Sequence, residues 1–504
     1  MGQDSSLRSL PAFAAAFRGG SWDREVSVST ISRWETARAP VPWRAVRRYE
    51  ELLGLPRNQL TATARTVWRY WAPGPVLDVE AVATSPTPLE DLLDRAVSDH
   101  LMTGDDWDRL VDGLCARPDV VLMPTGTWEQ VAERLVEEMV IADDVPWMLR
   151  FESLNRLLNH PRGGRTVIAV CAEMAAGSAR PTATEIVCAL DNCAHPDASD
   201  RVLRELIDPS GPLAHRGAVM ASFRKVDYRH FDEQQLTVLA RSVRDSAGTG
   251  PFGDQVEPLR WHLAAAHPEY ARALLAGLAR SSRPSPGEAA RGRTAVRRVP
   301  ADTAGVVRRV VACLGTVDPD RLHDSAVPAA LVSEALASPL FDVRLYAAFL
   351  LAATPFRAAV ADALAAELVR PMAVRRRIAV PLLEGLRVLG DHRHRGLLQR
   401  LAVTAGVPRS TSYAAVRGLG HVGAEPGAGD FLHDAVAHHE AAWRDSRDPV
   451  TAATLESLVY AVGMSARDDL LAAVLAEDRC LPAARAAAAW WLGIAGHRRA
   501  SALV

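Results

Sequence analysis

Lysine is almost missing from this sequence: Lys225 is the only lysine among 58 lysine and arginine residues. A phosphate-binding loop that ends in Gly-Lys-Ser/Thr needs a lysine directly after a glycine. Lys225 instead follows Arg224, so the sequence excludes that class of nucleotide-binding protein. There is also no Gly-x-Ser-x-Gly nucleophile turn. We therefore expect no enzymatic activity, no catalytic residues and no cofactor.

Long apolar runs are missing too. No stretch approaches the roughly 18 apolar residues needed to cross a bilayer, and Met1 to Asp4 show no basic-then-apolar targeting pattern. The six cysteines are scattered along the chain, as expected for free thiols packed as small core residues in a reducing compartment. These absences predict a cytoplasmic protein that does not interact with membranes.

Aromatic residues make up only 6% of the chain, whereas Ala, Leu and Arg are abundant. These three are strong helix formers, and apolar residues recur with helical period along most of the sequence. One such stripe begins at Leu89 and ends at Val97. Because 504 residues exceed the size of a single core, we expect an all-α protein of several units.

Two breaks rich in Pro, Gly and Ser divide the chain. The first runs from Ala72 to Pro88. The second begins at Ser281 and is basic as well as loop-like, so we expect a solvated loop there. The expected order is a helix-turn-helix head (1–71), a linker (72–88), a divergent helical region (89–280), the basic loop (281–303) and a repeat region (304–504).

Five short helical segments with small apolar residues recur in the last third of the chain. They begin at Arg344, Arg377, Ser412, Leu455 and Arg485. Successive starts are 33, 35, 43 and 30 residues apart. This is the period of a two-helix repeat, in which each pair of helices buries its apolar face by stacking on its neighbours.

Two of the repeat openings carry a further signal. Asp342-Val-Arg and Ala373-Val-Arg, each after a proline, resemble the opening of HEAT repeats. The resemblance spans about 338–496 and implies an α-solenoid. The segments 198–207 and 217–226 are candidate divergent repeats of the same kind.

Charge is unevenly distributed. Residues 1–71 carry 11 arginines and 6 acidic residues, about +5, which leaves about −7 for the rest of the chain. A basic head on a mildly acidic body points to nucleic acid at the head.

The head contains one short helical motif. Ser27 is a good N-cap, and Val28, Ile31 and Trp34 recur at a spacing that predicts a buried stripe. Four polar residues fall on the opposite face: Ser29, Thr30, Ser32 and Arg33. Small polar side chains on a short helix can reach base edges in the major groove, and an arginine can contact guanine or phosphate.

A second helix should follow from Pro42, which suits the first helical position, to Gly54, which suits a C-terminal cap. The periodicity predicts four buried residues, Val46, Tyr49, Leu52 and Leu53. It predicts three presented arginines, Arg44, Arg47 and Arg48. Three arginines beside a polar face would supply the neutralisation of phosphates that DNA binding requires.

The run from Val28 to Glu35 (VSTISRWE) resembles the recognition helix of Cro-type, or XRE-type, helix-turn-helix domains, and 49–56 resembles the helix that follows it. The resemblance covers about 27–60 and implies DNA binding. The family usually has glycine where this chain has Ala37, and the usual Ala-x-x-x-Gly-Val-Ser pattern before the recognition helix is absent. Either Pro11 to Arg18 forms the positioning helix with an enlarged turn, or the domain is truncated.

Metal chemistry has weak support. Cys188, Cys193 and His195 are spaced Cys-x4-Cys-x-His, but a zinc site needs a closer pair and further ligands. Cys188 lies in an apolar run and is expected in the core, so we predict no metal site.

These patterns predict a transcription regulator that binds double-stranded DNA through Ser27, Ser29, Thr30, Ser32, Arg33, Arg44, Arg47 and Arg48. The repeat body would bind a protein, a peptide or an effector, or would dimerise, because one such head covers a half-site. The alternative is an interaction scaffold with a vestigial head. A third hypothesis, a nucleic-acid enzyme resembling HEAT-repeat DNA glycosylases, needs a basic groove and fits the acidic body poorly.

Overall fold

The protein was examined as a computed structural model that describes residues 9–71, 87–118, 123–176, 182–246, 253–275, 301–314, 326–338, 340–370, 372–423 and 431–504. The described part is all-α and contains no strand. Residues 72–86 of the expected linker and 281–300 of the expected basic loop lie outside it.

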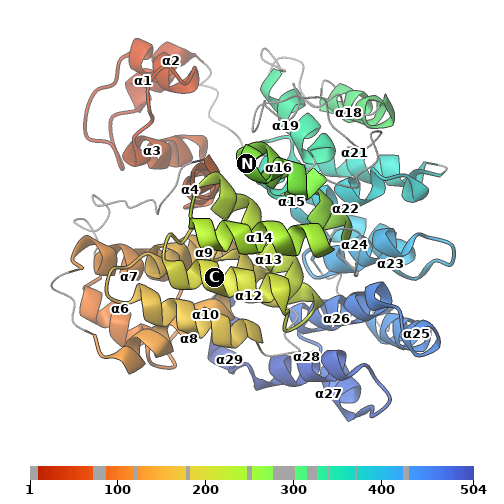
Figure 1. Ribbon diagram of the computed structural model, residues 1–504. Helices are drawn as coiled ribbons and strands as arrows, with labels where there is room; N and C mark the ends of the chain where they lie inside the picture. The colour runs from red at the N-terminus through yellow and green to blue at the C-terminus, as the bar shows by residue number, and fades with distance from the viewer. Residues whose placement is uncertain are drawn as a thin grey trace.

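Four helices come first in the chain (Figure 1). They are α1 (Leu10–Ala16), α2 (Val28–Glu35), α3 (Trp43–Leu53) and α4 (Gln59–Trp71). The bounds of α2 are those that the sequence predicts. The first three helices have a small apolar core of their own, separate from the large core of the body.

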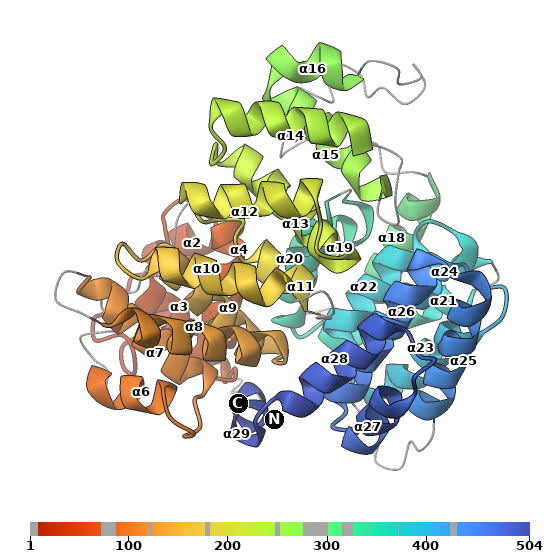
Figure 2. The ribbon, with the colours of Figure 1, turned by 60° about the horizontal axis from the view of Figure 1, so that its bottom comes forward.

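The first arm of the body follows. It comprises α6 (Leu89–Ala96), α7 (Gly104–Ala116), α8 (Thr125–Val140), α9 (Asp144–Leu158), α10 (Gly164–Ala176), α11 (Ala183–Cys188), α12 (Pro196–Ile207), α13 (Pro212–Asp227), α14 (Glu233–Ser246), α15 (Gly253–Ala266) and α16 (Pro268–Leu275). Helices α8, α10, α12, α14 and α16 form one layer, visible as a ladder in Figure 2. Helices α11, α13 and α15 stack behind it. The candidate repeats 198–207 and 217–226 lie in α12 and α13, which pack as a pair.

The second arm comprises α18 (Ala301–Leu314), α19 (Ala326–Ala337), α20 (Phe341–Ala352), α21 (Arg357–Val369), α22 (Ala379–Leu389), α23 (Arg395–Val403), α24 (Arg409–Leu419), α25 (Phe431–Ser446), α26 (Pro449–Met464), α27 (Asp468–Ala476), α28 (Pro482–Gly493) and α29 (Gly496–Ala502). Helices α20, α22, α24, α26 and α28 stack on one another in order, and α21, α23, α25 and α27 back them. The five recurring segments of the sequence are these five stacked helices. One opening differs: Ala373–Arg375 forms a separate 3-10 turn before α22.

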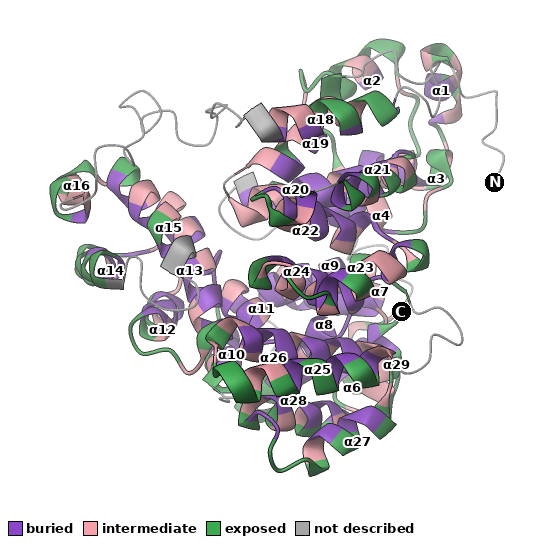
Figure 3. Cartoon of the chain, turned by 90° about the vertical axis from the view of Figure 1, so that its right-hand side faces the viewer, coloured by how far each residue is buried: buried purple, intermediate pink, exposed green. Residues whose placement is uncertain are grey.

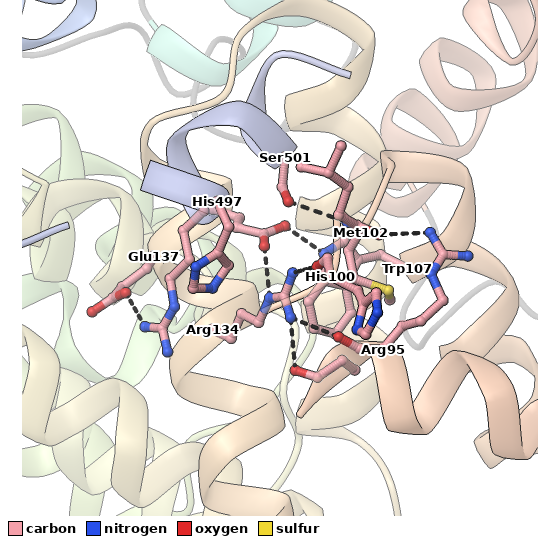
Figure 4. A network of polar contacts seen from close by, with 12 residues as sticks. Arg95, His100, Met102, Trp107, Arg134, Glu137, His497 and Ser501 are labelled. Carbon is pink, nitrogen blue, oxygen red and sulfur yellow. Dashed lines mark hydrogen bonds and ion pairs between the residues drawn. The ribbon is translucent and has the colours of Figure 1, made fainter. Parts of the chain in front are cut away.

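The two arms meet again at the C-terminal end of the chain, where α29 packs against α8. The Met102 amide donates to Ser501 Oγ over 3.1 Å, and the Gly104 amide donates to the carbonyl of Val504 over 2.9 Å. Arg498 pairs with Glu137 beside these bonds. Figure 4 shows this junction, with side chains from α7, α8 and α29 directed toward one another. The last described helix of the second arm is therefore joined directly to the beginning of the first arm.

Helix α4 belongs to the expected head (1–71) but lies against the body. It packs against α9 of the first arm and α20 of the second. Arg69, fully buried, donates to Glu152 and Asp191 over 3.0 Å and to the Tyr346 hydroxyl over 3.1 Å. Buried charge is stable only when it is paired in this way. Because its partners are spread over three segments of the body, α4 connects the head to both arms.

Candidate nucleic-acid interface

Helix α2 has the local features that the sequence predicts. Ser27 caps it, accepting the Thr30 amide at 3.1 Å. Ile31 and Trp34 are buried at 0% and 9% exposure, whereas Val28 is 38% exposed. The prediction of Val28 as a core residue was wrong, because Val28 is not among the residues that pack in the apolar core of the head.

An aromatic cluster holds α2 in place. Its members are Phe13, Phe17, Trp22, Trp34 and Tyr49, and neighbouring ring centroids lie 5.3–6.0 Å apart. Edge-to-face and tilted contacts of this kind add to the energy of burial. The cluster draws on α1, the segment after it, α2 and α3, so it fixes α2 relative to all its neighbours.

The polar face of α2 points away from this cluster. Ser29 and Arg33 are exposed, and Thr30 and Ser32 are half-buried. Arg33 donates through Nε to the Ser29 carbonyl and through Nη2 to Thr30 Oγ1, both at 3.3 Å. Ser27 Oγ lies 2.9 Å from the hydroxyls of both Ser29 and Thr30. In Figure 1, α1 and α2 lie together at the outer edge of the molecule, away from the body.

Helix α3 also forms where the sequence predicts it, and it ends at Gly54, whose φ of 62° is left-handed. Pro42 is the N-cap rather than the first helical residue. Val46 is buried, and Tyr49 and Leu52 are partly buried. Leu53 is 44% exposed, so its predicted burial was wrong. Leu53 lies in the last turn of α3, outside the group of apolar residues that forms the core of the head.

Arg48 of α3 is turned inward, and Arg44 and Arg47 are half-buried, whereas all three were expected to be presented to solvent. Arg48 donates to the carbonyls of Phe17 (2.9 Å) and Ala16 (2.7 Å) and to Glu51 (2.7 Å). Its side chain is only 13% exposed. Arg48 therefore caps the C-terminal end of α1, where carbonyls lack helical partners.

Arg44 and Arg47 have partners within the protein as well. Arg44 donates to the Ser21 carbonyl at 3.3 Å and lies 3.8 Å from Asp23. Arg47 lines a cleft of about 760 Å³ between head and body, which Asp108 of α7 also lines. Burial alone would raise the pKa of Asp108, but Arg65 and the other arginines around it, Arg47 included, hold that pKa well below its usual range.

The connection from α1 to α2 is an enlarged turn, as one of the two hypotheses held. It spans residues 17–27, whereas the usual connection has three or four residues. Glu51 of α3 anchors it by accepting the Ser21 amide at 3.1 Å. Gly20 has a φ of +52°, and a Cβ there would lie 1.9 Å from Glu51 Oε2. A larger residue there would have to displace the Glu51 carboxylate, and the positive φ independently favours glycine.

Ala37, after α2, has a φ of 54°. This is the left-handed region, which glycine adopts readily and other residues adopt at a cost. The departure from the family pattern at Ala37 therefore lies at a position where the backbone itself favours glycine.

Two exposed arginines near α2 were missed by the sequence analysis. Arg24 precedes α2 and its side chain is 77% exposed, while Arg38 follows α2 and is also exposed. Both arginines could have been noted from the sequence, because each lies within a few positions of the predicted helix.

The Cys-x4-Cys-x-His residues do not converge. Cys193 Sγ donates to the Leu158 carbonyl, Cys188 Sγ lies 3.7 Å from the Gly217 carbonyl, and His195 caps α12. Across the described ranges, no group of three or more His, Cys, Asp or Glu side chains could hold a metal ion.

Two spacings known from catalytic or nucleotide-binding motifs also occur, and both lie in packed helices. Ser222 and Lys225 are spaced Ser-x-x-Lys, but Ser222 donates to the Ala218 carbonyl and Lys225 to the Cys193 carbonyl. Gly418, Gly420 and Gly423 are spaced Gly-x-Gly-x-x-Gly. They lie at the C-terminal end of α24, whereas a dinucleotide loop joins a strand to a helix.

Among the helices that the structure describes, none is both long enough and apolar enough to cross a bilayer. No protein-family model, no curated protein and no solved structure matches this chain. The findings establish an all-helical protein whose helices pair into an array.

Proposed function

We propose that this chain is a transcription regulator that binds double-stranded DNA by placing α2 in the major groove. The observation that carries the proposal is the geometry of α2: a short capped helix at the edge of the molecule, with its apolar side held by an aromatic cluster and its polar side exposed. This is how a recognition helix must be held to reach base edges. The resemblance of 27–60 to Cro/XRE-type domains supports the same function.

The structure refines the residues proposed to contact DNA. Ser29, Thr30 and Ser32 would read base edges, and Arg33 would contact a base or a phosphate. Arg24 and Arg38 flank α2 and would neutralise phosphates, with Arg44 and Arg47 acting at longer range. We assign Arg48 to holding the head together, since its donors are used within the protein. Ser27 serves mainly as the cap of α2.

The body would provide the contacts between subunits and with other partners that a single recognition helix does not make. A single head covers a half-site, so we expect a homodimer on DNA. Because α4 contacts both arms, a protein or small molecule bound to the body would have a direct connection to the head.

The test begins with selection of double-stranded DNA from a random pool by the full chain, followed by salt titration of binding to the selected sequence. The double variant Arg24→Ala/Arg38→Ala should bind more weakly and lower the salt slope by up to about 2, since each phosphate contact contributes about 0.9. Arg479→Ala, an exposed arginine between α27 and α28 at the far end of the body, is the matched control. Failure to enrich any DNA, or an unchanged slope in the double variant, would overturn the proposal.

Base reading has a separate test. Thr30→Val keeps the shape of the side chain and removes its hydroxyl. It should reduce the preference for selected over random DNA while leaving the salt slope unchanged, because phosphate contacts carry no sequence information.

An interaction scaffold is the second candidate. The inward orientation of Arg48 and the partial burial of Arg44 and Arg47 favour it, because the head then offers fewer exposed cations to phosphates than its sequence suggests. Affinity purification that recovers one protein partner and no DNA would support the scaffold over the regulator.

A further inference from the structure

A cavity of about 260 Å³ lies between the two arms of the body. Residues of α13 and α15 form one side and residues of α20 and α22 the other, two groups of helices that Figure 3 shows facing each other. Tyr70, at the end of α4, forms part of the wall. The cavity therefore lies where both arms and the helix from the head come together.

Much of the lining is apolar. Val219, Met220 and Phe223 project from α13, and Phe341 and Val380 come from the opposite arm. An apolar lining with a few fixed polar groups is the usual composition of a small-molecule site.

The polar group that distinguishes the cavity is Arg224. Its side chain is only 2% exposed. Nη2 donates to Asp342 at 3.1 Å, and the guanidinium carbon lies 3.7 Å from the centre of the Tyr70 ring. Nη1 is buried and has no hydrogen-bond partner. A buried donor without an acceptor is costly, and Arg224 lines the cavity, so a ligand that brings an acceptor to its guanidinium would recover that cost.

The other charged groups of the lining are largely occupied. Arg344 donates to Glu384 at 2.8 Å, and His262 lies 3.1 Å from Asp227. Arg216 donates to the Tyr413 hydroxyl at 2.9 Å and adds positive potential at the edge of the cavity. Arg224 Nη1 is thus one buried donor of the lining that remains unsatisfied, and His262 Nε2 is another. Arg224 is the more deeply buried of the two side chains.

We propose that this cavity binds a small organic anion: a carboxylate that accepts from Arg224, attached to an aromatic or aliphatic body that packs against Phe223, Phe341 and Val380. The charge-assisted bond to a buried guanidinium fixes one end of the ligand. The volume of the cavity accommodates a small molecule and excludes a folded partner or a nucleic-acid duplex.

The probe is 4-fluorobenzoate, followed by ¹⁹F NMR on the full chain, with the uncharged 4-fluorobenzyl alcohol as the matched ligand control. We expect saturable binding of the carboxylate and binding of the alcohol at least about tenfold weaker, because the alcohol cannot form the charge-assisted hydrogen bonds that a carboxylate makes with a guanidinium. Equal binding of both probes, or no saturable binding of the carboxylate at millimolar concentration, would overturn the proposal.

Two variants locate the site. Arg224→Lys keeps a cation beside Asp342 but removes Nη1, and should weaken 4-fluorobenzoate binding at least about tenfold. Met220→Trp fills the cavity from its partly exposed side without touching the ion pair, and should abolish binding. Arg165→Lys, on an exposed arginine of α10, is the matched control and should bind as the unmodified chain does. Circular dichroism verifies that each variant is folded, and unchanged binding in either folded cavity variant would refute the site.

Amide hydrogen exchange gives an independent readout. The probe should slow exchange in α13, in α20 and at the end of α4, and protection confined to other helices would contradict the assignment. These measurements need no DNA, so a negative result would leave the proposed DNA binding in place, and the reverse also holds.

Discussion

Lys225 offers a sharp test of the structure because it is the only lysine in the chain and is fully buried. Its Nζ donates to the Cys193 carbonyl at 2.8 Å and to Ser199 Oγ at 3.2 Å. Burial lowers the pKa of Lys225 from 10.5 to about 8, although Cys193 and Asp191 nearby act in the opposite direction. The folded chain therefore releases this proton at lower pH than the unfolded chain does.

The sign and size of the effect follow from that difference. Below pH 8 the lysine is protonated in both states, and above pH 10.5 it is neutral in both. Between these values the unfolded state binds more protons, so the contribution of Lys225 to stability rises with pH. A shift of 2.5 pKa units corresponds to about 3 kcal/mol.

The perturbation is Lys225→Met, which keeps the length of the side chain and removes the titration. Near pH 7 the variant loses two hydrogen bonds but also loses a buried charge, so its stability should be close to that of the unmodified chain or above it. At pH 10.5 the unmodified chain has gained about 3 kcal/mol relative to the variant. Thiols and tyrosines titrate in the same pH range in both proteins. Subtracting the unfolding free energy of Lys225→Met from that of the unmodified chain at each pH therefore isolates the contribution of Lys225.

The assay is urea unfolding followed by circular dichroism at half-unit steps from pH 7 to pH 10.5. Arg165→Met, on the exposed face of α10, is the control and should show a difference that does not change with pH. A difference between Lys225→Met and the unmodified chain that stays constant across the range would refute the reasoning. A second readout is His230, whose pKa is lowered to about 4 by burial and by Lys225; it should rise in Lys225→Met and can be followed by NMR.

Three further predictions address other regions. Glu138 is fully buried and accepts hydrogen bonds from Trp107 at 2.7 Å and from Arg134 at 2.8 Å. Glu138→Ala should lower the free energy of urea unfolding by about 3–5 kcal/mol, because it leaves buried arginine charge unpaired. The control Glu133→Ala, at an exposed neighbouring position, should change stability little. Ala37→Gly should remove the strain of the left-handed backbone after α2 and stabilise the head by about 0.5–1 kcal/mol. Amide hydrogen exchange at Ile31 and Trp34 should then be slower, and faster exchange there would contradict the prediction. Burial lowers the pKa of His439 to about 4. Between pH 6.5 and pH 4 the unfolded chain therefore binds this proton more readily than the folded chain does, and stability should fall as the pH drops through that range. An equally steep decline in a His439→Gln variant would contradict this.

The local features of the head and the repeats could be read from the sequence. Capping and periodicity gave the bounds of α2 and the end of α3 at Gly54, because these depend on residues within one or two turns. The spacing of the five recurring segments identified the stacked helices of the second arm. Such signals are local or periodic, which is why one sequence suffices to detect them.

Tertiary partners could not be predicted in the same way. Arg69 bonds to Tyr346, which lies 277 residues further along the chain, and nothing in the local pattern around either residue indicates the other. The arginines of α3 show the same limit: helical period places Arg48 on a polar face, but only the enlarged turn brings the end of α1 within its reach. Net charge was a poor guide to the body, since many of its arginines are buried in ion pairs.

The junction between the two arms at α29 also bears on how the protein unfolds. An open solenoid frays from its ends, and the stability of each repeat depends only on its immediate neighbours. Here α29 is secured to the start of α7 and to α8, so the two arms hold each other at this end. Unravelling should instead begin at α16 or α18, whose main contacts are with helices of their own arm. Loss of α29 would free this end too, so that each arm could then unfold from both of its ends rather than from one.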